Sequence, residues 1–128
     1  ECDITKFDQS GFDYAVMAHS SWYFESAEQL GKTLRNLSTK AKYLCFAEWN
    51  TVPRSSDQTA HLMAVFIQGY MEAFKTEGTA NVRSPFTVNQ LKQIIVESGW
   101  RITSFASPDT RGLQDADWEI AECIARVN

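Results

Sequence analysis

Two short polar and aromatic clusters hold the side chains of this sequence that could do chemistry. Residues 19–23 follow directly after the apolar run 14–18, and residues 48–50 follow directly after the apolar run 43–47. Apolar runs of this length are typical of strands buried on both faces of a parallel sheet. Because open α/β sheets bind ligands outside the carboxyl ends of their strands, both clusters are predicted to lie at one ligand-binding edge.

His19 is the candidate catalytic residue of the first cluster. A neutral imidazole at the mouth of a site can accept a proton from a hydroxyl or an amine. The alternative is a loop histidine that bonds through its backbone, so that only its main chain flanks a ligand. His61 lies near the start of a predicted helix and is interpreted as a surface residue.

The aromatic residues beside these clusters allow two interpretations. Trp22, Tyr23 and Trp49 could wall a substrate pocket and stabilise a cationic group, or they could be core residues. Glu48 ends a predicted buried strand, where an unpaired charge is costly, so it needs a partner or a wet cleft. Arg83 could be that partner or could clamp a substrate carboxylate, and the alternative is a solvated loop arginine.

Composition narrows the class of protein. The 128 residues suffice for one domain with a core, and the net charge of −4 with scattered Lys and Arg is unlike a nucleic-acid binder. No apolar stretch approaches the ~20 residues of a membrane span, and no signal peptide is expected. The odd number of cysteines, with no zinc-binding spacing, favours buried free thiols in a reducing, cytoplasmic compartment over a disulfide. These cysteines are Cys2, Cys45 and Cys123.

The pattern between the clusters predicts alternating helices and strands. A helix over residues 26–40 opens on an S-x-x-Q capping box and joins the first two strands into a β-α-β unit. A second helix begins after Ser55 or Ser56 and has an apolar face running from Leu62 to Phe74. A third helix begins with a capping box at residues 87–90 and ends at Gly99.

Two further strands are predicted near the end of the sequence. Residues 100–105 alternate in polarity and are predicted to form a strand with one more exposed face. Residues 118–127 also alternate, and are predicted to form a final strand antiparallel to its neighbours, because only a loop joins the two.

Several short motifs together resemble one protein family. Residues 12–16 (FDYAV) resemble the entry to the fourth strand of class I S-adenosylmethionine-dependent methyltransferases, and residues 18–24 (AHSSWYF) resemble its exit. Residues 97–100 (ESGW) resemble the helix end before the sixth strand of that family. Residues 18–24, 47–49 (AEW) and 81–83 (NVR) also resemble segments of fungal methyltransferase-like proteins.

The resemblance implies an α/β Rossmann-like fold, the C-terminal half of a class I methyltransferase sheet, with strands equivalent to the fourth to seventh. It implies S-adenosyl-L-methionine as cofactor, with Asp3 accepting from the adenine amino group and Ala18, His19 and Ser20 at the same site. The alternative for Asp3 is an exposed terminal carboxylate. The chain lacks the family's glycine-rich loop, so residues 1–128 are expected to form a single partial methyltransferase-like domain.

Two functions from different classes follow from this. The first is methyl transfer to a small molecule, by an enzyme of which this chain is the C-terminal portion and which is inactive until the N-terminal half is supplied. The second is a non-catalytic interaction subunit that pairs with another chain along the edge of the strand at residues 14–18, since an uncovered apolar edge invites association. A hydrolase is disfavoured because no G-x-S-x-G motif is present.

Overall fold

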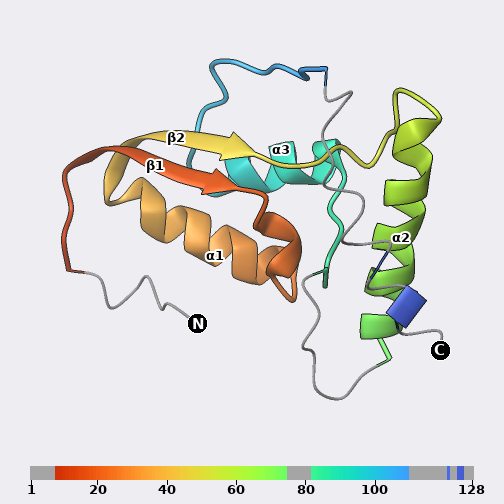
Figure 1. Ribbon diagram of the computed structural model, residues 1–128. Coiled ribbons are helices and arrows are strands. Elements are labelled where there is room, and N and C mark those ends of the chain that lie inside the picture. The colour runs from red at the N-terminus through yellow and green to blue at the C-terminus, as the bar shows by residue number, and fades with distance from the viewer. Residues whose placement is uncertain (1–7, 75–81, 110–120, 122–123, 126–128) are drawn as a thin grey trace.

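A computed structural model describes residues 8–74, 82–109, 121 and 124–125, which form an α/β arrangement. Two strands lie side by side with helices packed against one of their faces, and a longer helix stands beyond their carboxyl ends (Figure 1). No helix in these ranges is long and apolar enough to cross a bilayer. The elements in chain order are β1 (Phe12–Ala18), the 3-10 helix η2 (Ser21–Tyr23), α1 (Ala27–Ser38), β2 (Ala41–Ala47), α2 (Asp57–Glu72) and α3 (Val88–Glu97).

The two strands pair in parallel, which confirms the predicted β-α-β unit. Tyr14 lies opposite Tyr43, and Ala18 opposite Ala47, so both strands end at the same level. One further backbone bond continues the pairing, from the amide of His19 to the carbonyl of Ala47 at 2.9 Å. The two polar clusters therefore leave the sheet at one edge, as predicted.

The helix ends follow the local signals of the sequence. Thr87 and Gln90 form the reciprocal capping box expected at the start of α3. At α1, the Ser26 hydroxyl accepts from the Gln29 amide at 3.2 Å, while the Gln29 side chain accepts from the preceding Glu25 amide. Gly99 has φ +90°, the left-handed conformation predicted for the residue that ends α3.

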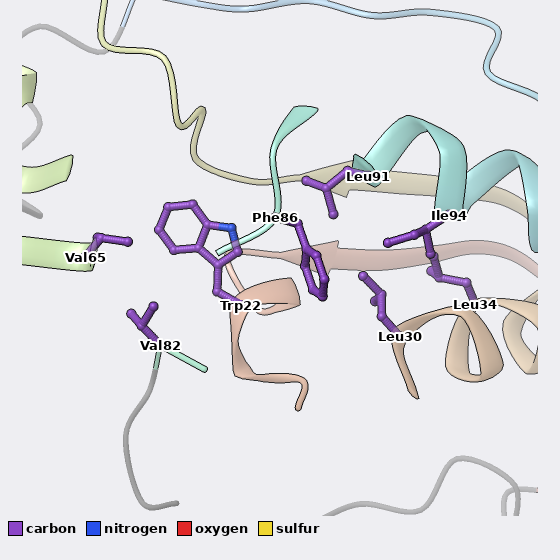
Figure 2. Close-up of a cluster of buried hydrophobic side chains, with 8 residues drawn as sticks. All are labelled: Trp22, Leu30, Leu34, Val65, Val82, Phe86, Leu91 and Ile94. Carbon is purple, nitrogen blue, oxygen red and sulfur yellow. The ribbon is translucent and has the colours of Figure 1, made fainter. Parts of the chain in front are cut away.

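The hydrophobic core lies between α1, α3 and the inner face of the sheet (Figure 2). Leu30 and Leu34 of α1 are fully buried, and Leu91 and Ile94 of α3 meet them. Met17, Leu44 and Phe46 pack on this cluster from the strands. The remaining members of the cluster are Trp22, Val65, Val82 and Phe86.

The expectation that both faces of the strands are buried is wrong. Tyr14 and Val16 are 62% and 74% exposed, and Tyr43 is 59% exposed, because no element of the described ranges covers this side of the sheet. Cys45 lies opposite Val16 on the same face and is an exposed free thiol, so the prediction of a buried cysteine is also wrong there. Cys2 and Cys123 lie outside the described residues.

Of the two strands predicted near the end of the sequence, the first does not form, and the second lies largely outside the described residues. Residues 100–109 have no regular secondary structure, although the Trp100 indole donates to the Leu34 carbonyl at 2.9 Å. A segment of alternating polarity forms a strand only when a neighbouring strand pairs with it, and the described sheet contains only β1 and β2. Of the predicted final strand, only Ala121, Ile124 and Ala125 are described, and they are helical.

The buried side of α2 also differs from the predicted one. Val65, Gln68 and Glu72 are buried with Ala64, whereas the predicted face is largely exposed. The reason is close packing, since a Cβ added at Gly69 would lie only 3.4 Å from the Pro85 ring. Small residues bring the helix against the segment after it and turn the bulky ones outward. The exposed ones are Met63, Phe66, Ile67, Tyr70 and Phe74.

Candidate functional site

Glu48 is the central polar residue at the carboxyl edge of the sheet. Its side chain is only 3% exposed, although it carries a carboxylate. Its Oε2 accepts from the amide and hydroxyl of Ser21 at 2.9 and 2.7 Å, and its Oε1 accepts from the Trp49 amide at 2.9 Å. The predicted need of this carboxylate for partners is met by these neutral donors, which tie the end of β2 to η2.

His19 lies beside the Glu48 carboxylate. Its Nδ1 is 3.7 Å from Glu48 Oε1, while the imidazole as a whole is 52% exposed. Its backbone has φ +48°, the only left-handed conformation among the non-glycine residues of the described ranges. Strained backbone of this kind is concentrated at functional sites in proteins. The site thus pairs a buried acid with an accessible imidazole.

Trp49 connects His19 with α2. Its ring centroid lies 5.1 Å from that of His19 on one side and 5.3 Å from that of His61 on the other. His61 is half-buried and reaches the site, contrary to the prediction of a surface residue. The helical pattern did not reveal it, because His61 lies one turn before Val65, which is buried but does not belong to the predicted apolar face.

These residues open into a large cavity of about 1030 Å³. Ligand sites of small molecules have volumes of roughly 300–1,000 Å³ and mostly apolar walls. The walls here come from β1, β2, α3, the start of α2 and residues 99–108, and they include Phe46, Leu62, Trp100 and Phe105. Two cationic side chains contact residues 99–108, which close one side of the cavity. Arg54 Nη1 donates to the Ser107 carbonyl at 2.9 Å, and Lys92 Nζ lies 3.8 Å from the centroid of the Phe105 ring.

The other predicted pocket residues are placed differently from one another. Trp22 is 5% exposed and belongs to the core, and it also touches the cavity; its indole nitrogen is buried with no hydrogen-bond partner in the described part of the chain. Tyr23 is 49% exposed and is not among the described residues that line the cavity.

Arg83 does not pair with Glu48. Its Nη1 donates to Glu25 Oε1 at 3.1 Å, and its backbone amide donates to the Trp22 carbonyl at 2.8 Å. It is not among the described lining residues of the cavity, so the structure does not bring it to the site. Asp13 forms an exposed ion pair with Lys42 at 2.9 Å across the two strands.

The structure describes three of the four residues expected at the cofactor. Asp3 lies outside the described residues, whereas Ala18 ends β1, His19 follows it, and Ser20 precedes η2 without a side-chain capping bond. The described glycines, Gly11, Gly31, Gly69 and Gly99, do not lie at the carboxyl end of either strand. In the described part of the chain, this end of the sheet therefore carries Ala18, His19 and Ser20 but no glycine-rich loop. Within the described ranges, no group of three metal-binding side chains occurs.

Comparison with known proteins identifies one similar solved structure. It is a cyclopropane-fatty-acyl-phospholipid synthase-like protein from Lactobacillus casei ATCC 334, with 38% sequence identity and a TM-score of 0.81. The match covers 92% of this chain and 43% of that chain, so the present sequence spans less than half of the protein that it resembles. No protein-family model and no curated protein matches the chain.

This match bears on the predicted fold in two ways. It supports an α/β, methyltransferase-like Rossmann fold, because nearly the whole chain superimposes at substantial sequence identity. It gives no support to a particular closeness to fungal proteins, since the matched protein comes from Lactobacillus casei. The chain therefore has the fold of a segment of a larger, synthase-like protein.

Proposed function

We propose that this chain is the acceptor-side portion of an S-adenosylmethionine-dependent methyltransferase acting on a small molecule. The observation that carries the proposal is the match of 92% of the chain to a synthase-like protein at a TM-score of 0.81. The position of His19 and Glu48 at the carboxyl edge of a parallel sheet agrees with it. The same proposal includes two finer expectations. β1 and β2 would be equivalent to the fourth and fifth strands of the methyltransferase sheet, and the chain would form the C-terminal part of the full fold.

The residues of this chain have separate tasks in the proposal. Ala18, His19 and Ser20 border the cofactor, and Asp3 is retained as the acceptor for the adenine amino group. When bound, the cofactor supplies an electrophilic methyl group whose bonding electrons return to sulfur as the acceptor attacks. The protein contributes alignment and exclusion of water, and His19 takes the proton that the acceptor loses.

The cavity indicates the class of acceptor. Its walls are mainly aromatic and aliphatic, and its volume of about 1030 Å³ exceeds what a very small polar molecule fills. The similar Lactobacillus protein is named a cyclopropane-fatty-acyl-phospholipid synthase-like protein, and fatty-acyl phospholipids have long apolar chains. An acceptor with a substantial apolar part therefore fits this chain, with Trp49 and Trp22 as wall residues.

Titration calorimetry with S-adenosylhomocysteine tests the proposal. The 128-residue chain alone is expected to give no heat up to about millimolar ligand, since it lacks the glycine-rich loop. A chimera, in which this chain replaces the matched segment of the Lactobacillus protein, is expected to bind. A chimera that folds but gives no heat would contradict the proposal, and micromolar binding by the chain alone would contradict the incomplete-site part of it.

A second function is favoured by the open side of the sheet. The described sheet leaves the outer edge of β1 without a strand, and Tyr14, Val16 and Tyr43 are exposed beside it. A non-catalytic subunit that pairs with another chain along β1 would cover this edge. In this case a chimera would be stable and still fail to bind S-adenosylhomocysteine, whereas the first proposal requires that binding.

A further inference from the structure

One carboxylate oxygen of Glu48 has an acceptor position left. A carboxylate oxygen accepts about two hydrogen bonds. Oε2 uses both of its positions on the amide and hydroxyl of Ser21, at 2.9 and 2.7 Å. Oε1 uses one on the Trp49 amide at 2.9 Å, and His19 Nδ1 lies 3.7 Å from the same oxygen.

We propose that Glu48 is a positioning residue that holds the His19 imidazole with its proton on Nδ1, which leaves Nε2 unprotonated as the base at the cavity. This inference rests on the proposed function and names how the same site would work. The separation of 3.7 Å is longer than a hydrogen bond of about 2.7–3.2 Å. Such contacts are often long without substrate and shorten when the site is filled.

Two independent restraints aim the imidazole at this oxygen. The backbone of His19 is left-handed at φ +48°, and its amide donates to the Ala47 carbonyl at 2.9 Å, one residue before Glu48. The ring also lies against Trp49 at a centroid distance of 5.1 Å. The imidazole is half exposed, and His19 lines the cavity, so a substrate can reach the nitrogen that does not face Glu48.

The arrangement specifies the kind of acceptor. An attacking hydroxyl or amine forms the new bond to the methyl group with its lone pair, and its proton moves to Nε2 of His19. The imidazole then carries a positive charge next to the negative charge of Glu48, so the pair becomes neutral overall. The inferred acceptor is thus one that carries a proton on the attacking atom.

Nitrogen-15 NMR of the chain tests the tautomer without any cofactor. Neutral histidine in water prefers its proton on Nε2, so a proton on Nδ1 requires a partner at that nitrogen. At about pH 8.5, where an ordinary imidazole is neutral, His19 is expected to show a protonated Nδ1 and an unprotonated Nε2. Glu48→Gln is expected to return His19 to the solution preference, while His61 serves as a control in the same spectrum.

A matched variant separates a local effect from a loss of structure. Ser98→Ala removes a different buried hydroxyl, which donates to the Gly31 carbonyl at 3.1 Å, and is expected to leave the His19 tautomer unchanged. A spectrum of the unmodified chain with the His19 proton on Nε2 would overturn the inference, even if the Glu48→Gln chain failed to fold. The inference would also be overturned if the Glu48→Gln chain folded and His19 kept its proton on Nδ1.

Activity of the chimera gives a second readout. Glu48→Gln is expected to lower kcat on the order of 10²-fold, within the range of about 10²–10⁴ that a positioned base contributes. Its affinity for S-adenosylhomocysteine is expected to stay unchanged; unchanged kcat would overturn the inference. A chimera that never binds the ligand contradicts the proposed function instead, and the tautomer result then still decides the role of Glu48.

Discussion

Glu48 binds Ser21 twice through one oxygen, because Oε2 accepts both the backbone amide at 2.9 Å and the hydroxyl at 2.7 Å. The two residues are 27 positions apart in the sequence. Ser21 is fully buried, so the contact fixes η2 on the end of β2 in a place that water does not reach. The position of the His19 loop depends on this contact, since the loop lies between β1 and η2.

The first prediction therefore concerns the strength of this hydrogen bond. Ser21→Ala is expected to lower the free energy of unfolding by about 1.5–3 kcal/mol, because the lost hydroxyl donates to a charged acceptor, the Glu48 carboxylate. Ser98→Ala is the matched control, since its buried hydroxyl donates to a neutral carbonyl and its loss costs about 0.5–1.5 kcal/mol. Urea unfolding measures both, and equal losses would show that the charge on Glu48 adds nothing.

A second prediction concerns the backbone of His19. A left-handed conformation costs a non-glycine residue roughly 1–2 kcal/mol. Both His19→Gly and His19→Ala remove the imidazole, but only alanine keeps the strain at φ +48°. The glycine variant is expected to be more stable than the alanine variant by about 1 kcal/mol in urea unfolding. Equal stability would mean that the loop relaxes once the ring is gone.

The carboxyl edge of the sheet could be predicted from the sequence because it depends on local features. Apolar runs, capping boxes and Gly99 each specify their own segment, so β1, β2, α1 and α3 appear where expected. The apolar run before each residue placed His19 and Glu48 at this edge, and the parallel order of the two strands placed them beside each other. Neither predicted the distance of 3.7 Å between them, because that depends on the left-handed turn at His19.

The parts that could not be predicted depend on contacts between distant segments. Residues 100–105 alternate like a strand, but alternation does not supply a neighbouring strand. The buried side of α2 is set by contact of Gly69 with Pro85 and not by the most apolar stripe. For the same reason the helical pattern did not predict that His61 reaches the site, where its ring meets Trp49 at 5.3 Å.

A third prediction tests the open face of the sheet. Val16 is 74% exposed and Leu34 is fully buried, although both belong to regular elements. Val16→Ser is expected to change the unfolding free energy of the chain by about 0.5 kcal/mol or less. Leu34→Ala is expected to cost about 2–5 kcal/mol. A large loss for Val16→Ser would show that this face is covered in solution, and sedimentation would then tell whether a second copy covers it.

The last prediction uses two glycines with opposite requirements. At Gly31, inside α1, an added Cβ would meet Arg35, Ser98 and Ile94 side-chain atoms at 3.5, 3.5 and 3.7 Å, which are ordinary contacts. Gly31→Ala is therefore expected to stabilise the chain by up to about 1 kcal/mol, the difference in helix propensity.

At Gly99 the space is open, since the nearest atom to an added Cβ is Ser38 Oγ at 3.8 Å. The backbone has φ +90°, however, so Gly99→Ala is expected to destabilise the chain by about 1–2 kcal/mol through strain alone. Thermal unfolding of the two variants should thus move the midpoint in opposite directions. If Gly31→Ala also lowered it, α1 and the end of α3 would pack more closely than these distances indicate, and the Ser98 to Gly31 bond would be the first contact to examine.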